Sequence, residues 1–148
     1  MPKVEAFIAE ILRYSSLAIF GVPRTVSSDT NFAGYFIPKG SIVMAAQKMV
    51  QHDKNFYSSP ESFNPQRFLD VNGKFQNPKE GFLPFGIGKR VCLGENLARV
   101  ELFIFLVTML QHVEFHAPPN KGINLNPISN PFFSVPHFSE EILIKTRD

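Results

Sequence analysis

The residues with the clearest chemical potential lie in one loop, Pro84–Gly94, which contains the only cysteine of the chain, Cys92. Lys89 and Arg90 stand just before this cysteine, and a helix-like apolar stretch follows it. A helix N-terminus and neighbouring cations both stabilise a thiolate. Cys92 is therefore suited to be a redox group, a nucleophile or an axial ligand to haem iron. The structural alternative is an inert buried thiol, the usual environment of a free cysteine.

Two other functions of glycine-containing loops, dinucleotide binding and phosphate binding, are each excluded by individual residues. A dinucleotide-binding fingerprint would need a third glycine where Val91 stands. A phosphate-binding P-loop would need glycine at Leu83 and serine or threonine at Arg90. A nucleophilic cysteine needs a nearby base, and no local pattern links a histidine to Cys92. The histidines are His52, His112, His116 and His137.

Two helices are expected to frame a long irregular segment. Apolar residues recur at helical spacing near the N-terminus: Val4, Ile8, Ile11 and Leu12. This spacing predicts an amphipathic helix over residues 3–15. A second helix is predicted from Leu93 to His112, directly after the cysteine loop. Residues 51–91 are expected to be irregular, and an irregular stretch of that length usually carries function.

Short apolar runs predict strands at Val22–Val26, Tyr35–Ile37 and Ser41–Met44. Pro38–Gly40 has turn chemistry, so we expect the second and third runs to pair as a hairpin. The proline-rich tail is expected to form loops and a short terminal hairpin that ends near Ile142–Ile144.

Composition places the chain among ordinary globular proteins. The 148 residues carry a net charge of +2, with 44% hydrophobic and 19% charged residues. That charge is too small to indicate a nucleic-acid partner, and one cysteine excludes an internal disulfide. We expect no targeting or membrane segment in this chain, because its longest apolar run, Leu102–Leu110, is far too short to span a bilayer. The apolar helix faces need partners, so we interpret the chain as part of a larger domain rather than a complete small α+β domain.

Four motifs together resemble the cytochrome P450 family, and the resemblance covers nearly the whole chain. Residues Phe85-x-x-Gly88-x-Arg90-x-Cys92-x-Gly94 match its haem-binding signature at every defined position. Three further segments match in the family's order: Glu10-x-x-Arg13, Pro23-Arg24 and the Pro-x-Arg-Phe segment at 64–68. Tyr35–Gly40 and Lys89–Glu95 are most similar to the animal microsomal members, which metabolise drugs and steroids.

The resemblance implies a mainly α fold with small β-sheets (α+β). Residues 1–148 are expected to be the C-terminal third of the P450 domain, a partial domain. Its parts would be the Glu-x-x-Arg helix, a β-hairpin region, the Pro-x-Arg-Phe segment, the cysteine loop with its following helix, and a terminal hairpin. We expect these residues to contain no counterpart of the family's membrane anchor or of its central oxygen-activating helix.

The family's site residues carry over position by position. Cys92 would be the axial thiolate ligand of haem b iron. Arg24 and Arg90 would pair with the haem propionates, with Phe85, Gly88 and Gly94 also at the cofactor. Glu10, Arg13 and Arg67 would form a buried ion network that braces the cysteine loop. Two segments, Leu17–Val22 and Asn130–Ser134, resemble substrate-contacting segments of the family. Their candidate contacts are Leu17, Val22, Phe132 and Phe133, for which ordinary core packing is an equally weighted alternative.

The implied activity is monooxygenation. A haem-thiolate enzyme of this type uses O2 and electrons from an NADPH-dependent flavoprotein reductase to hydroxylate a lipophilic substrate such as a xenobiotic, steroid or fatty acid. The full-length parent is expected at the endoplasmic reticulum membrane, on its cytoplasmic face, held by the N-terminal anchor. We expect the 148-residue chain alone to be inactive. The alternatives are a truncated non-catalytic remnant that binds haem weakly or not at all, and a thiol redox module built around Cys92.

Overall fold

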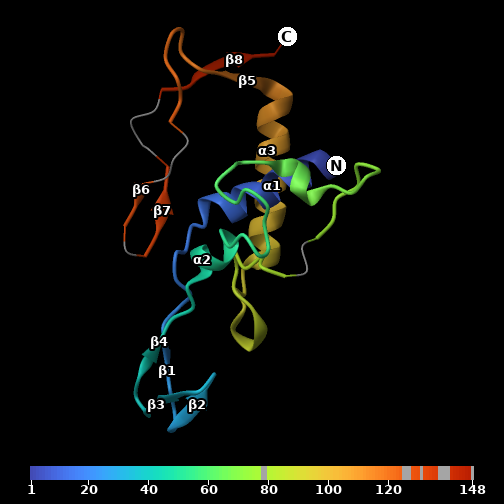
Figure 1. Cartoon of the computed structure of the whole chain (residues 1–148). Coiled ribbons are helices and arrows are strands. Elements are labelled where there is room, and N and C mark those ends of the chain that lie inside the picture. Colours follow the sequence, from blue (N-terminus) through green and yellow to red (C-terminus); the bar gives the residue numbers. More distant parts are fainter. Residues whose placement is uncertain (78–79, 125–127, 131, 137–140, 148) are drawn as a thin grey trace.

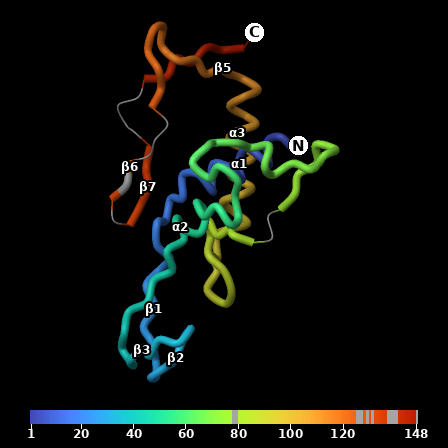
Figure 2. The backbone as a smooth tube through the Cα atoms, in the orientation of Figure 1, coloured from blue at the N-terminus to red at the C-terminus, as the bar shows by residue number. Residues whose placement is uncertain are grey.

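The computed structural model describes residues 1–77, 80–124, 128–130, 132–136 and 141–147. Its two long helices, α1 (Pro2–Ser15) and α3 (Glu95–His112), cross near the middle of an elongated molecule (Figure 1). Small two-stranded sheets lie toward both ends, and the backbone between them follows an irregular path (Figure 2). Helices combined with small antiparallel sheets make this an α+β fold, as the sequence predicts.

Helix α1 forms where the apolar spacing predicts it and buries one face completely. Pro2 occupies the first turn, where its missing N–H costs nothing. The buried face carries small residues, Ala6 and Ala9, together with Glu10 and Arg13. The helix ends at Ser16, whose left-handed backbone (φ 42°) stops the helical path. The small side chains let the following segments approach α1 closely.

The strand pairing predicted around residues 35–44 is wrong. Strand β3 (Tyr35–Ile37) pairs with β2 (Thr30–Phe32), whereas β4 (Ile42–Val43) pairs with β1 (Arg24–Thr25). The reason is a two-residue turn at 33–34 in which both residues have positive φ, 50° and 85°. Such a turn closes a tight hairpin with the native twist. The Pro38–Gly40 turn instead returns the chain to β1.

The C-terminal pairing also differs from the prediction. The last strand, β8 (Leu143–Thr146), pairs with β5 (Val113–His116), which continues directly from α3. A separate hairpin joins β6 (Ile128–Ser129) to β7 (Ser134–Val135). The last strand therefore returns to the end of α3, a long-range pairing that local turn signals cannot reveal.

Three short helical segments lie between β4 and α3. The sequence analysis did not predict α2 (Gln47–Gln51), which is too short for a clear period. The 3₁₀ turns η1 (Pro65–Phe68) and η2 (Gly88–Arg90) lie within the segment expected to be irregular. The small apolar core, where α1 meets η1, consists of Ala6, Ala9, Tyr57 and Phe68. Leu69, Phe75 and Phe82 pack against it.

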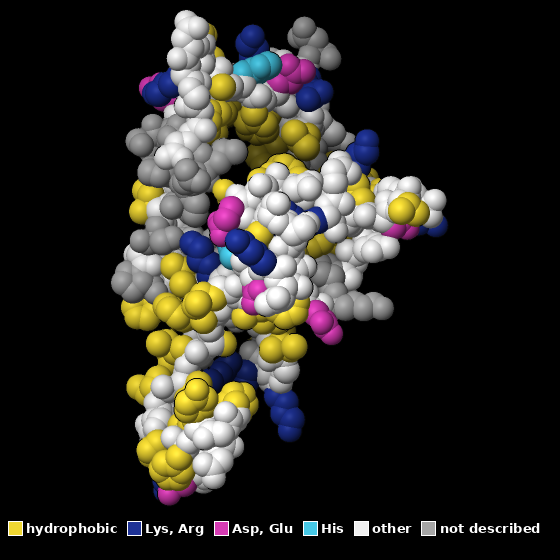
Figure 3. All heavy atoms as spheres, viewed as in Figure 1, with side chains coloured by type: hydrophobic (Ala, Val, Ile, Leu, Met, Phe, Trp, Pro, Cys, Tyr) yellow, Lys and Arg dark blue, Asp and Glu magenta, His cyan; other side chains and the backbone are white. Residues whose placement is uncertain are grey.

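Helix α3 is apolar on most sides and has no buried residue. Leu97 and Phe105 are each 63% exposed, and Val100 and Ile104 are more than half exposed. Apolar side chains also gather on the surface at the lower end of the molecule in Figure 3, the end that carries β1 to β4 in Figure 1. No helix in the described part of the chain has the length and apolarity needed to cross a membrane.

We predict that α3 makes the 148-residue chain self-associate, because exposed contiguous apolar surface is removed from water by association. Leu97→Lys and Phe105→Glu should each raise the monomer fraction measured by analytical ultracentrifugation. Val71→Glu is the matched control, since Val71 is fully exposed on a turn away from α3. Equal association of all three variants and the wild type would contradict this role for α3.

Candidate functional site

The cysteine loop, Pro84–Gly94, turns on two glycines. Gly86 and Gly88 have φ values of 79° and 78°, a backbone region that side chains disfavour. The haem-binding signature includes Gly88 but not Gly86. Gly94 has φ −88°, which needs no special conformation. Gly94 instead precedes α3 and lies beside the sulfur, where a Cβ would be 3.9 Å from Cys92 Sγ.

Cys92 is exposed at the start of α3. Its backbone N–H donates to the carbonyl of Phe85 at 2.9 Å, which closes the loop on itself. The carbonyl of Cys92 in turn accepts from Glu95 N–H at 3.3 Å, at the first turn of the helix. No group of three or more His, Cys, Asp or Glu side chains within the described ranges could hold a metal ion.

Arg24 approaches the cysteine loop from a distant part of the sequence. It lies on β1, and its guanidinium donates to the carbonyl of Arg90 at 3.5 Å. Strand β1 is held by pairing with β4, so the position of this guanidinium follows from the sheet. The fold therefore brings together the two arginines expected to bind acidic groups of a ligand.

Aromatic rings support the other side of the loop. The Arg99 guanidinium lies 5.6 Å from the centre of the Phe82 ring and 5.3 Å from that of Phe85. Arg99 also pairs with Glu95 at 2.8 Å, one turn earlier on α3. Cation–π contacts of this kind contribute about 0.5–1 kcal/mol each at exposed sites. They hold Phe85 against α3.

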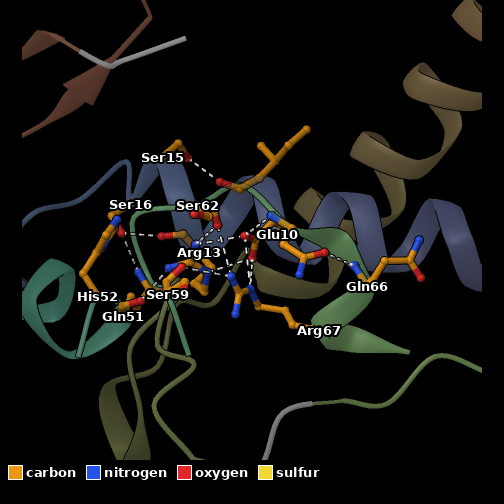
Figure 4. Close-up of polar contacts among 12 residues, drawn as sticks. Glu10, Arg13, Ser15, Ser16, Gln51, His52, Ser59, Ser62, Gln66 and Arg67 are labelled. Atoms are coloured by element: carbon orange, nitrogen blue, oxygen red, sulfur yellow. Dashed lines mark hydrogen bonds and ion pairs between the residues drawn. The ribbon is translucent and has the colours of Figure 1, made fainter. Parts of the chain in front are cut away.

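Glu10, Arg13 and Arg67 come together in a buried ion network (Figure 4). Arg13 donates from Nε and Nη2 to the Glu10 carboxylate at 2.7 and 2.9 Å, and both side chains are 0% exposed. Arg67 Nε lies 3.2 Å from the same carboxylate. The backbone N–H of Asn64 adds a donor at 2.7 Å. The carboxylate thus has two cationic partners and one neutral donor.

The network fixes the irregular segment through backbone carbonyls. Arg13 Nη1 donates to Gln51 O at 2.8 Å, at the end of α2. Arg67 donates to the carbonyls of Ser58 and Ser62, each at 3.0 Å. Within the described part of the chain, no hydrogen bond runs from these three charged side chains to residues 84–94. Any bracing of the cysteine loop must therefore pass through other residues.

Sequence patterns do not predict the residues that complete the network. Gln51 donates from its side-chain amide to Ser16 Oγ at 3.0 Å, and Ser16 donates to the carbonyl of Arg13 at 2.6 Å. A buried glutamine in a five-residue helix gives no periodic signal. Asn64 gave a weak signal, since asparagine before proline favours turn initiation.

The two candidate substrate segments lie against each other. Ser134 N–H donates to the carbonyl of Leu17 at 2.9 Å, and Ile19 N–H donates to that of Phe132 at 3.0 Å. The side chains of Leu17, Val22, Phe132 and Phe133 are all more than half exposed. Residue 131 of the second segment lies outside the described residues. The exposed side chains give the joined segments an apolar surface.

Two titratable groups beside the network have shifted pKa values. Burial lowers the pKa of His52 below its ordinary 6.5, and the Arg13 charge lowers it further, against the Lys48 carbonyl that raises it. His52 Nδ1 lies 3.0 Å from that carbonyl. Burial raises the pKa of Tyr57 to about 12. The Tyr57 ring lies 5.1 Å from the Arg13 guanidinium, so it caps the ion network with an uncharged face.

Comparison with known proteins gives one consistent result. A family model described as "Cytochrome P450" matches residues 1–141. The chain is 45% identical over 137 residues to cytochrome P450 2B4 of Oryctolagus cuniculus, covering 92% of this chain and 28% of that protein. It is 44% identical to cytochrome P450 1A1 of Sparus aurata, with 86% and 25% covered, and 42% identical to cytochrome P450 2S1 of Homo sapiens, with 92% and 27% covered. The chain thus spans about a quarter of the length of these relatives.

Removing Arg13 should destabilise the fold severely. Arg13→Ala leaves the buried Glu10 carboxylate without its main partner, which costs about 3–5 kcal/mol. The measurement is the free energy of unfolding in urea. Lys121→Ala is the control, because its pair with Glu141 is exposed and should contribute at most about 1 kcal/mol. Similar losses for both variants would show that burial of the Glu10 network adds nothing.

The lowered pKa of His52 predicts acid sensitivity. The native state disfavours protonated His52, so the unfolded chain takes up this proton first as the pH falls below about 6.5. The stabilising effect of neutral His52 is therefore present above pH 6.5 and declines as the pH falls toward the native pKa. His52→Gln should flatten the dependence of the unfolding free energy on pH between 7.5 and 5.5. His116→Gln, at an exposed site, should retain it; the reverse pattern would refute the assignment.

Proposed function

Because the chain belongs to the cytochrome P450 family, we propose that it supplies the iron ligand, Cys92, of a haem-thiolate monooxygenase. The observation that carries this proposal is the exposed thiol at the start of α3, in a loop closed by its own hydrogen bond to Phe85. A thiol in this position can approach a flat ligand without rearrangement of the backbone.

The surroundings of Cys92 fit a haem. Its apolar neighbours Ile87 and Leu93 are exposed, which suits an apolar ring system. A Cβ on Gly88 would meet no atom within 4 Å, so the described residues leave open space beside the loop. Arg24 and Arg90 offer positive charge for carboxylates. Apolar surface, one thiolate ligand and two arginines match the chemistry of haem b.

Each residue has a distinct task in this proposal. Cys92 would hold the iron, and the backbone N–H groups that follow it would moderate the charge on its sulfur. Arg24 and Arg90 would orient the ligand through its propionates, and Phe85 would help to exclude water from the sulfur once the ligand covers the loop. When bound, the haem would supply the chemistry that inserts one oxygen atom of O2 into a substrate and reduces the other to water.

A lipophilic substrate is the class that the joined segments favour. The hydrogen bonds among Leu17, Ile19, Phe132 and Ser134 hold two apolar segments as one surface. Leu17, Val22, Phe132 and Phe133 are the candidate contacts. For the whole protein we propose electrons from an NADPH-dependent flavoprotein reductase and a location at the cytoplasmic face of the endoplasmic reticulum membrane. Its similarity to microsomal relatives supports both.

A second candidate function is a non-catalytic remnant, and the uncovered α3 favours it for the 148-residue chain by itself. No residue of this helix is buried, and the thiol is open to solvent. Water at an open site diverts oxygen chemistry to side reactions. We propose that this chain alone does not couple NADPH consumption to substrate hydroxylation.

The sharpest test of Cys92 as the iron ligand uses a graft, in which residues 1–148 replace the matching segment of rabbit cytochrome P450 2B4. The graft should show the thiolate-type carbon monoxide spectrum after reduction, and Cys92→Ser should lose it because the soft sulfur donor is gone. Lys54→Ser, at an exposed turn, should keep the spectrum. An unchanged spectrum in Cys92→Ser would show that another residue binds the iron.

The same graft separates enzyme from remnant. With reductase, NADPH and a lipophilic substrate, the graft should form product in proportion to the NADPH consumed, whereas the 148-residue chain with added haem should not. Coupled hydroxylation by the isolated chain would refute the proposed inactivity. A graft that binds haem without forming product would favour the remnant.

A further inference from the structure

Gln47, the first residue of α2, lies buried where three separate segments meet. Two backbone hydrogen bonds tie the segment before β1 to α2 and to the residues just before it: Gly21 N–H donates to Ala45 O at 2.8 Å, and Lys48 N–H of α2 donates to Ile19 O at 3.1 Å. In Figure 1, α2 lies where the chain passes from α1 toward β1. The cysteine loop is the third segment, and its contact with Gln47 is through a glycine.

The side-chain amide of Gln47 lies next to a glycine in each of the two other segments, in the space that a Cβ there would approach. A Cβ on Gly21 would lie 3.3 Å from Gln47 Nε2 and 3.6 Å from its Cδ. A Cβ on Gly86 would also lie 3.3 Å from Gln47 Nε2. Among the described residues, and apart from its chain neighbours, no other atom lies within 4 Å of that Gly86 position. The amide therefore fills the space between the segment before β1 and the cysteine loop.

We propose that Gln47 is a positioning residue for Cys92: its side chain is the spacer that sets Gly86, and with it the cysteine loop, against the segment at Gly21. Gly86 stands beside Phe85, whose carbonyl accepts the N–H of Cys92 at 2.9 Å. A shift of Gly86 therefore changes the hydrogen bond that closes the loop. Only the consequence at the iron rests on the proposed function; the spacer role does not.

The spacer also explains how the buried ion network reaches the cysteine loop. Gln51 at the other end of α2 holds Arg13 through its carbonyl, at 2.8 Å. Gln47 lies one helical turn earlier and faces Gly86. Helix α2 thus connects the Glu10–Arg13 pair to the loop that carries the thiol, although among the described residues these two charged side chains make no hydrogen bond to that loop.

The two loop glycines provide a matched test. Gly86→Ala and Gly88→Ala impose the same backbone strain, because their φ values are 79° and 78°, but only the Cβ at Gly86 meets Gln47. Hydrogen exchange of the Cys92 amide should be faster in Gly86→Ala than in Gly88→Ala by about threefold to tenfold. In a Gln47→Ala background the two should become equal. A difference that persists, or is absent from the start, would overturn the proposal.

If Gly86→Ala does not fold, the single variant Gln47→Ala provides a second test. Gln47→Ala should speed exchange of the Cys92 amide about threefold or more, without affecting the Gly73 amide, which donates to Asp70 O in a distant turn. Equal effects on both amides would indicate general destabilisation and overturn the spacer role. These readouts need no haem, so they are independent of the proposed function.

The consequence at the iron is read in the rabbit graft. Gln47→Ala should convert part of the thiolate-type carbon monoxide spectrum to the form that lacks thiolate ligation. Gln47→Met, which keeps length and volume, should restore it. Met behaving as Ala would overturn a spacer role. A graft with no thiolate-type spectrum even as wild type would count against the proposed function alone, since the exchange results stand by themselves.

Discussion

The buried Glu10 carboxylate is the constraint on which the rest of this structure depends. It lies at 0% exposure and accepts from two nitrogens of Arg13, from Arg67 and from the backbone of Asn64. A charge buried this completely is tolerated only with such partners, and removing one partner costs more than the intact pair contributes. Since the described apolar core is small, centred on Tyr57 and Phe68, the network decides how the irregular segment meets α1.

A series of contacts connects this network to the cysteine loop. Arg13 holds the end of α2 through Gln51, and α2 presents Gln47 to Gly86. The loop then closes through the hydrogen bond from Cys92 to Phe85 and passes into α3. Each step is a backbone contact or a close approach to glycine, so small displacements are transmitted. An exposed thiol held by a buried network is suited to bind a ligand in one fixed orientation.

The sequence predicts helices that have a clear apolar pattern and site residues that belong to a motif with several defined positions. Apolar spacing located α1, a continuous apolar run after the cysteine loop located α3, and the motifs singled out Glu10, Arg13, Arg67 and Cys92. Strand pairing was predicted wrongly around Pro38–Gly40, because a competing turn with positive φ at residues 33–34 closes the hairpin earlier. Gln47 and Gln51 could not be found, since their roles depend on which backbone atoms of distant segments surround them. Local patterns carry no information about such partners.

The most direct test of the central claim is residue-resolved hydrogen exchange at Asn64. Its backbone N–H donates to the buried Glu10 carboxylate at 2.7 Å although it lies in an otherwise irregular segment. If the carboxylate organises the fold, this amide exchanges only when the whole structure unfolds, as slowly as the amides in the middle of α1. Exchange at the rate of an exposed loop amide would contradict the account.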